Sequence, residues 1–352
     1  MMIKDALLKL IYGKNLTKKE AMNIMRDIMN GKVSPVQIGA LLTALRSKGE
    51  TIDEITAFAS VMREFSNKIT FDEPNLVDTC GTGGDSIKTL NVSTAVAFVV
   101  AGVGIPVAKH GNRSVTSKSG SADVLEYLGF NLSQTPKEVE NTLNDCGICF
   151  MFAPTFHPAM KYAVGPRREL GIRTVFNILG PLTNPASVKY QVLGTFDPDL
   201  TETMAKVLMN LGTKRALVVH GMDGLDEIST FGKTKISELN EGKIDTYYVT
   251  PKDFGITPSK REDIERLADV KENARDLLSI LHNVKGPLYD LTLVNAAAAI
   301  RAVENIPLKE AVEYAKKSIE SKKAYEKLKQ LIKSSSNNTK ILDKMEEKQW
   351  GS

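Results

Sequence analysis

The sequence predicts an α/β protein in which a small all-helical domain precedes a larger α/β domain with a mostly parallel central sheet. Two observations support this prediction. Three helix-start signatures lie within residues 1–66. From Leu76 onward, short apolar strands alternate with helices, which is typical of a parallel sheet covered on both faces. We place the helical domain at residues 1–70, the α/β domain at 71–333 and a polar, disordered tail at 334–352.

Each helix-start signature is a hydroxyl residue followed three positions later by Glu or Gln, a pair that bonds reciprocally across the first turn of a helix. Proline at the first helical position and glycine just beyond the last turn mark helix boundaries in the same way. The pairs are Thr17 with Glu20, Ser34 with Gln37 and Thr51 with Glu54; Pro35 follows the second, and Gly31 and Gly49 mark helix ends.

The α/β domain contains apolar runs that predict strands, namely LVD, IPVAKH, ICFMFAP, YQVLGTF and RALVVHG. Because ligands bind beyond the carboxyl ends of parallel strands, we expect functional loops after Asp78, Lys109 and His220. A peripheral hairpin and a later return to helices are predicted for residues 233–250 and 295–302.

The composition excludes several classes of protein. The net charge of +4 comes from 46 basic and 42 acidic residues spread along the chain, which is too balanced for a nucleic-acid-binding protein. No apolar run approaches the roughly 18 residues that a membrane span needs, and the N-terminus lacks the features of a signal peptide. We therefore expect a cytoplasmic protein that binds neither nucleic acid nor a membrane.

The three cysteines, Cys80, Cys146 and Cys149, fit a reducing compartment. Cys146 and Cys149 form a CxxC pair, which would suit a redox motif or half of a zinc site. We favour a structural interpretation, because zinc needs further ligands at suitable spacing. Gly147 instead predicts the end of a helix before a buried strand.

The loop after the first strand, GTGGD at residues 81–85, predicts a phosphate-binding site. Its glycines let successive backbone N–H groups curl around an anion. It is not a Walker A loop, since no Gly-Lys-Ser/Thr follows, and not a Rossmann fingerprint, since Ser86 stands where the third glycine belongs. Taken alone, this loop is equally compatible with a tight turn.

Two polar segments accompany the glycine-rich loop. NVST at residues 91–94 opens the next helix and adds hydroxyl and amide groups at a helix N-terminus, although simple helix capping would explain them too. KHGNRS at residues 109–114 puts a cation, an imidazole, an amide and a guanidinium at one strand end, and residues 118–121 continue towards a helix start. The alternative for that segment is an exposed polar loop.

The segment DGLDE, residues 223–227, places adjacent carboxylates at another strand end. Carboxylates beside a phosphate site would repel the substrate unless a divalent cation lay between them. Together the loops therefore predict Mg²⁺ carrying a polyphosphate. A solvated acidic turn is the alternative for Asp226 and Glu227.

The most distinctive stretch is FAPTFHPAMKYAVGPRRELGIRTVFNILGPLTNP, residues 152–185. His157 and Pro158 predict a helix start, and three arginines, Arg167, Arg168 and Arg173, lie in or near the far half of that helix. A planar guanidinium is well matched to a substrate carboxylate. The alternative is that these arginines are surface residues or partners of the helix C-terminus.

In this order, GTGGD, NVST, KHGNRS with KSGSAD, HPAM with RRELGIRT and NILGPLTNP, and DGLDE closely resemble the motifs of the anthranilate phosphoribosyltransferases over residues 1–330. One such motif is modest evidence, whereas five in register are highly specific. The departures are small: Ser114 and Thr116 replace the commoner Ala and Ser, and the polar tail has no family counterpart.

The resemblance implies an enzyme of tryptophan biosynthesis that moves the phosphoribosyl group of phosphoribosyl pyrophosphate (PRPP) to the amine of anthranilate. It implies a homodimer formed through the helical domain, to which a segment near residues 158–180 returns. The α/β domain would be of the kind shared with pyrimidine nucleoside phosphorylases. Two Mg²⁺ ions per subunit would arrive with PRPP.

The resemblance also assigns roles to residues at the matching positions. The PRPP-binding residues would be Gly81, Thr82, Gly83, Gly84, Asp85, Thr89, Asn91, Ser93, Thr94, Lys109 and Ser121. The anthranilate-binding residues would be Gly81, His110, Asn112, His157 and Arg167. The metal ligands would be Ser93, Asp226 and Glu227.

Two other functions compete with this interpretation. A pyrimidine nucleoside phosphorylase of the same architecture would need only inorganic phosphate and a nucleoside pocket, and DGLDE and the segment around Arg167 argue against it. A non-catalytic nucleic-acid-binding relative should have eroded metal and ribose motifs and a basic patch. Here the motifs are intact and the charge is balanced.

Overall fold

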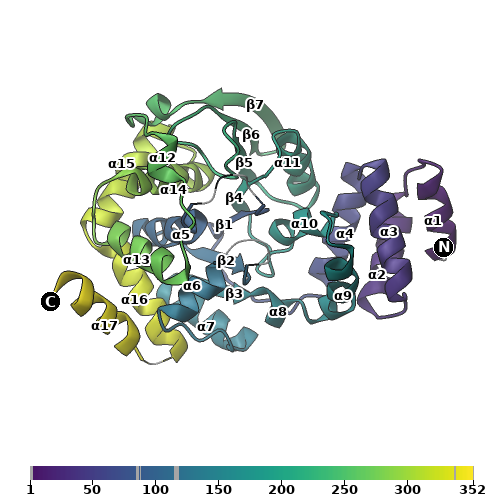
Figure 1. The fold of residues 1–352 in the computed structure, drawn as a ribbon, viewed down its shortest axis with the longest axis horizontal. Coiled ribbons are helices and arrows are strands. Elements are labelled where there is room, and N and C mark those ends of the chain that lie inside the picture. The colour runs from purple at the N-terminus through teal and green to yellow at the C-terminus, as the bar shows by residue number, and fades with distance from the viewer. Residues whose placement is uncertain (1–2, 85–86, 88, 115–118, 337, 352) are drawn as a thin grey trace.

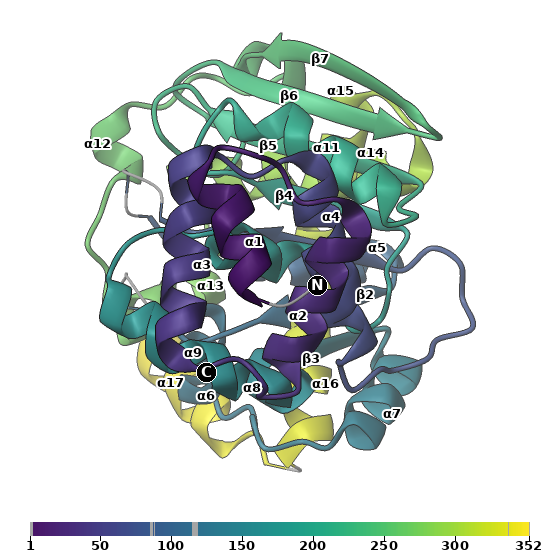
Figure 2. The ribbon, with the colours of Figure 1, turned by 90° about the vertical axis from the view of Figure 1, so that its right-hand side faces the viewer.

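The chain folds into a helical domain at one end and a larger α/β domain that holds the sheet (Figure 1). The computed structural model describes residues 3–84, 87, 89–114, 119–336 and 338–351. It confirms the predicted fold class, a helical domain joined to an α/β domain with a mostly parallel sheet. Figure 2 looks onto the helical domain, which lies in front of the sheet in that view.

The helical domain consists of N-terminal helices and one helix that returns from the middle of the chain. The three helix-start signatures are confirmed as reciprocal capping boxes at Thr17, Ser34 and Thr51. Each box satisfies two backbone N–H groups and so determines where its helix begins. The helices are α1 Ile3–Ile11, α2 Lys18–Met29, α3 Pro35–Lys48, α4 Ile52–Glu64 and the returning α9 Lys161–Leu170, which packs on α3.

The sheet of the described residues has seven strands in the order β3-β2-β1-β4-β5-β6-β7. The first five are parallel and correspond to the predicted apolar runs, while β6 and β7 form the predicted antiparallel hairpin at the edge. The strands are β1 Val77–Gly81, β2 Val107–Gly111, β3 Ile148–Phe152, β4 Tyr190–Gly194, β5 Arg215–Gly221, β6 Thr234–Asn240 and β7 Lys243–Val249.

Alternate strand residues face two different cores, as the twofold periodicity of a strand requires. On β5, Leu217 and Val219 join one core, whereas Ala216 and Val218 join the core shared with the helical domain. Because α11, Leu200–Asn210, packs on both β5 and α4, it connects the helical domain to this second face. The first core includes α5 Val92–Val103, α14 Pro287–Glu304, α15 Leu308–Glu320 and α16 Lys323–Ser336.

Shorter elements connect these layers. The predicted helix start at His157 is present as a 3₁₀ turn that leads into α9. Among the described residues, no helix combines the length and the apolar character that crossing a membrane requires. The remaining elements are α6 Ser121–Tyr127, α7 Pro136–Cys146, α8 Ala153–Phe156, α10 Phe176–Leu179, α12 Arg261–Ile264, α13 Val270–Leu281 and the 3₁₀ turns Pro158–Met160, Gly180–Leu182 and Pro251–Phe254.

The CxxC pair has the predicted structural role. Cys146 ends α7, Gly147 caps the helix with φ +68°, and Cys149 lies buried in β3. Burial raises the pKa of both the Cys146 and the Cys149 thiols. Both therefore stay protonated at neutral pH, unlike the low-pKa thiolates of redox motifs.

The prediction of a disordered tail at 334–352 is wrong for the described residues of that range. The helix α16 continues to Ser336, and α17 spans Lys340–Trp350. The tail is polar but amphipathic: Leu342 is fully buried, and the indole of Trp350 stacks on His282 at 4.3 Å between ring centroids. Tertiary packing of one apolar face stabilises a helix that composition alone does not reveal.

Candidate active site

The predicted loops meet at the carboxyl ends of β1, β2 and β5, near the middle of the sheet (Figure 1). In the glycine-rich loop after β1, Gly83 and Gly84 have φ values of +65° and +79°. Glycine adopts this backbone conformation without strain, and a turn of this kind can form an anion cradle. Asp85, the last residue of the predicted loop, lies outside the described residues.

The glycine-rich loop is held by contacts with the next strands. The Thr82 N–H donates to the Gly194 carbonyl at 2.9 Å, and the Thr82 hydroxyl accepts from the Phe196 N–H at 3.1 Å. The Gly83 N–H donates to Oδ2 of Asp226 at 3.0 Å. The predicted phosphate loop and the predicted metal carboxylate therefore lie in direct contact.

Lys109 is a buried cation that joins the first two strand ends. Its Nζ donates to the Thr79 carbonyl at 2.6 Å and to the Ser93 hydroxyl at 3.0 Å. Burial lowers the pKa of Lys109, and the Asp78 carboxylate opposes that shift. Burial likewise raises the pKa of Asp78, with Lys109 opposing. The contact with Ser93 confirms that these two predicted PRPP ligands lie together.

Two other predicted PRPP-binding hydroxyls are buried near this point. The Oγ1 atoms of Thr89 and Thr94 have no hydrogen-bond partner among the described residues. A buried hydroxyl without a partner is costly, so a bound ligand that accepts or donates there would be stabilised. These atoms fit a polar ligand held against the start of α5.

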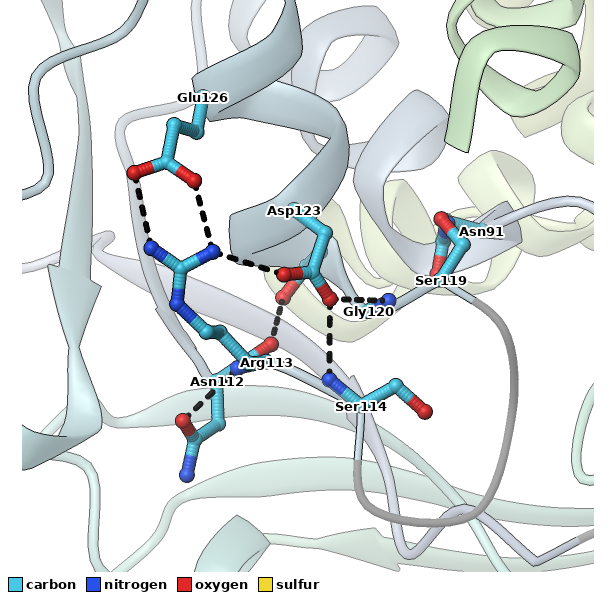
Figure 3. A network of polar contacts seen from close by, with 9 residues as sticks. Asn91, Asn112, Arg113, Ser114, Ser119, Gly120, Asp123 and Glu126 are labelled. Carbon is cyan, nitrogen blue, oxygen red and sulfur yellow. Dashed lines mark hydrogen bonds and ion pairs between the residues drawn. The ribbon is translucent and has the colours of Figure 1, made fainter. Parts of the chain in front are cut away.

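The second polar loop is anchored to α6, as Figure 3 shows. The Asn91 amide donates to the Ser119 hydroxyl at 3.2 Å, and the Ser121 hydroxyl donates to the Asn112 carbonyl at 3.4 Å. Three predicted ligands, Asn91, Asn112 and Ser121, are thus part of one network. The guanidinium of Arg113 instead pairs with Asp123 at 2.9 Å and with Glu126 at 2.7 Å, so it stabilises the loop.

His110 and His157 lie side by side, with ring centroids 5.1 Å apart. Burial lowers the pKa of His110 to about 3 and that of His157 to about 4. Both imidazoles are therefore neutral at pH 7. The Nε2 atoms of both rings are buried and have no hydrogen-bond partner among the described residues.

The segment 176–183 connects the histidine pair to Arg167. The His110 imidazole interacts with the backbone of Gly180, and the His157 imidazole interacts with the backbone of Thr183. The guanidinium of Arg167, at the end of α9, lies over the Phe176 ring with 5.1 Å from Cζ to the centroid. The described contacts do not join Arg167 directly to the imidazoles, but all three residues flank the same segment.

The acidic pair fits a divalent cation that is shared with a ligand. Asp226 contacts the glycine-rich loop, and the negative charge of Glu227 opposes the lowering of the Lys109 pKa. Oxygen ligands suit Mg²⁺, which is commonly held by one or two carboxylates together with substrate phosphates. No group of three or more His, Cys, Asp or Glu side chains that could hold a metal occurs within the described part of the chain. The residues present thus fit an ion that shares its ligands with a phosphorylated substrate.

Two site residues did not come from the sequence motifs. Asn273 on α13 accepts from the backbone N–H of Asn91 at 3.2 Å, and Phe196 contacts both the glycine-rich loop and Arg173. Asn273 lies 182 residues from its partner, so no local pattern could reveal it. Phe196 ends the apolar run YQVLGTF and lies two residues beyond the end of β4, and its place beyond a strand end was the available signal.

Comparison with known proteins gives one consistent result. Residues 4–66 match the model of the glycosyl transferase family helical bundle domain, and residues 73–325 match that of the glycosyl transferase family a/b domain. An anthranilate phosphoribosyltransferase of Acetivibrio thermocellus is 50% identical over 332 residues, which are 94% of this chain and 96% of the relative.

Solved structures agree with the sequence matches. The crystal structure of anthranilate phosphoribosyltransferase from Thermus thermophilus has a TM-score of 0.88 and 41% identity, covering 94% of this chain and 99% of that one. The Saccharomyces cerevisiae enzyme in complex with PRPP and Mg has a TM-score of 0.87 and 29% identity, covering 96% and 98%.

Proposed function

This chain belongs to the anthranilate phosphoribosyltransferase family, and from that premise we propose that it transfers the phosphoribosyl group of PRPP to the amine of anthranilate. The products are N-(5-phosphoribosyl)anthranilate and pyrophosphate, as tryptophan biosynthesis requires. The observation that carries the proposal is the 3.0 Å contact between the Gly83 N–H and the Asp226 carboxylate. It joins an anion cradle to the acidic pair, which is what a metal-bound diphosphate needs.

PRPP would lie along the carboxyl ends of β1 and β2. The pyrophosphate would lie against the glycine-rich loop at residues 82–84, next to the start of α5. Lys109 and Ser93, already bonded to each other, would hold the phosphoribosyl group from the β2 side. Asn91 and Ser121 would close the site from the α6 side.

Asp226, Glu227 and Ser93 would hold Mg²⁺, and two ions per subunit are part of the proposal. The oxygen-only ligand set and the PRPP and Mg complex of the yeast relative support the binding of Mg²⁺. When bound, Mg²⁺ neutralises charge that gathers on the departing pyrophosphate. The backbone dipoles of the glycine-rich loop and of the start of α5 would oppose the same charge.

Anthranilate would lie against His110, Asn112, His157 and Arg167. The neutral imidazoles give that wall a polar but uncharged character, and Arg167 supplies a planar cation for the substrate carboxylate. The aromatic amine of anthranilate is already neutral at pH 7, so the chain need not remove a proton before attack. Holding the amine against the ribose carbon, on the face opposite to pyrophosphate, contributes the proximity effect.

A homodimer through the helical domain is also proposed. Apolar side chains on α1, directly after it and at the start of α3 are exposed in the single chain, among them Ile11 at 68%, Tyr12 at 76% and Val36 at 82% of their surface. A contiguous surface of such groups would be suited to a protein interface. Light scattering on the protein as it elutes from a size-exclusion column should give the mass of two chains. The variant Val36→Glu should shift the measured mass towards that of one chain. A wild-type monomer would contradict this part of the proposal.

A cytoplasmic location is proposed as well, and the three free cysteines support it, since reduced thiols persist in a reducing compartment.

The test of the function is a fluorescence assay. Purified protein mixed with anthranilate, PRPP and Mg²⁺ should consume the fluorescence of anthranilate, and omission of any one component should stop the reaction. The competing function predicts a different result, in which uridine or thymidine reacts with inorganic phosphate and anthranilate fluorescence persists.

A further inference from the structure

Arg173 lies three residues beyond the end of α9, and its guanidinium reaches the glycine-rich loop of the other domain. It donates to the Gly84 carbonyl and lies over the Phe196 ring, with 4.3 Å from Cζ to the centroid. A Cβ added to Gly84 would stand 2.8 Å from Nη2 of Arg173, so the two groups are in close contact. This contact links the returning segment of the helical domain to the loop.

Phe196 connects the contact to the rest of the loop. Its ring supports the guanidinium, and its backbone N–H donates to the Thr82 hydroxyl at 3.1 Å. On the other side, the Gly83 N–H is held by Asp226 at 3.0 Å. The three successive residues 82, 83 and 84 are therefore each bound by a different partner, and Arg173 is the partner of the Gly84 carbonyl.

We propose that Arg173 is a positioning residue for PRPP, which keeps the glycine-rich loop in one conformation against which the pyrophosphate binds. Two successive glycines at positive φ give the loop many alternative conformations. A cation on the Gly84 carbonyl stabilises one of them and offsets the negative end of a peptide dipole beside an anionic ligand. The inference rests on the proposed function, because PRPP is the ligand.

The planar shape of the side chain matters as well as its charge. A guanidinium stacks on an aromatic ring and donates in its own plane, whereas an ammonium group on a flexible stem does neither in a fixed geometry. Lysine at position 173 should therefore restore part of the effect by charge alone. If Arg173 had a purely structural role, its replacement would change the stability of the protein. The lysine and alanine variants would then not differ in their affinity for PRPP at unchanged stability.

The experiment compares Arg173→Ala, Arg173→Lys and the matched control Arg168→Ala, which removes an exposed arginine of the same segment. Titration calorimetry with PRPP and excess Mg²⁺ gives Kd, steady-state kinetics give KM for each substrate, and thermal unfolding gives Tm. Arg173→Ala should raise Kd and KM for PRPP by roughly tenfold, the lower end for a hydrogen bond to a charged group. The KM for anthranilate should stay within about twofold.

Arg173→Lys should give an intermediate Kd for PRPP, and Arg168→Ala should behave as wild type, all with unchanged Tm. The inference is overturned if Arg173→Ala binds PRPP as wild type does, or if both KM values rise together with a fall in Tm. Calorimetry with PRPP needs no turnover. A wild-type protein that binds PRPP but consumes no anthranilate would therefore count against the proposed function and leave the test of Arg173 intact.

Discussion

Replacement of Arg167 by alanine should weaken anthranilate binding and leave PRPP binding nearly unchanged. The guanidinium is half-buried against Phe176, and burial lowers the pKa of Arg167. No acidic side chain among the described residues forms an ion pair with it. A partly desolvated cation without an acidic partner is stabilised when a carboxylate binds.

The magnitude follows from the contact that would be lost. A hydrogen bond to a charged group contributes about 1.5–3 kcal/mol, which corresponds to about 10- to 150-fold in affinity. Because the Arg167 side chain is still partly exposed, water screens part of this interaction, and we expect the lower end. The KM for anthranilate should therefore rise roughly tenfold, while the KM for PRPP should stay within about twofold.

The assay is steady-state fluorescence with each substrate varied in turn at saturating levels of the other. Arg168→Ala is the matched control: its side chain is exposed, lies about 100° further round α9 and should tolerate alanine. The reasoning would be refuted by the reverse pattern, in which Arg168→Ala impairs anthranilate use and Arg167→Ala behaves as wild type.

Four further outcomes are expected. Asp226→Asn should lower kcat/KM roughly tenfold or more, with partial rescue by excess Mg²⁺, because the amide is a poorer metal ligand. If this variant were as active as the wild type in chelator-treated buffer, the metal would have no part in the mechanism. Gly83→Val should raise the KM for PRPP with little change in Tm, because valine disfavours φ +65° although a Cβ there meets nothing within 4 Å; an unchanged KM would make the loop a simple turn. Below about pH 6.5 the unfolded chain protonates His110 and His157, while the folded chain, with pKa values of about 3 and about 4, does not. Urea titrations should therefore show the free energy of unfolding falling by roughly 1.4 kcal/mol per pH unit for each histidine, down to those pKa values. Replacing both histidines by Asn or Gln should flatten that slope, and an unaltered slope would contradict the low pKa values. Trp350→Ala should cost about 0.5–1.5 kcal/mol of unfolding free energy through the lost stacking, without changing kcat, and unchanged denaturant midpoints would show that α17 contributes no stability.

Local signals were enough to predict most of the fold. The capping boxes at Thr17, Ser34 and Thr51 and the apolar runs of the five parallel strands are short patterns whose physical cause lies within a few residues. The tail shows the limit of this reasoning. Trp350 and Leu342 are stabilised by packing on helices that the tail sequence does not contain, so composition predicted disorder where a helix forms.

The candidate site divides in the same way. The glycine-rich loop and the acidic pair were predicted because each is a contiguous motif beyond a strand end. Their direct contact, across 143 residues, depends on the strand order and became visible only in the fold. The ion pairs of Arg113 with Asp123 and Glu126 likewise indicate a structural role for this arginine, in contrast to the predicted binding residues beside it. The motif KHGNRS alone does not reveal this difference.

The most direct test of the proposed chemistry is the stoichiometry of the reaction in one sample, followed by phosphorus NMR and anthranilate fluorescence together. The proposed transfer predicts one pyrophosphate released for each anthranilate consumed, with neither change in the presence of chelator. The account would be contradicted if PRPP and anthranilate both persisted with Mg²⁺ present while inorganic phosphate was consumed on addition of uridine or thymidine.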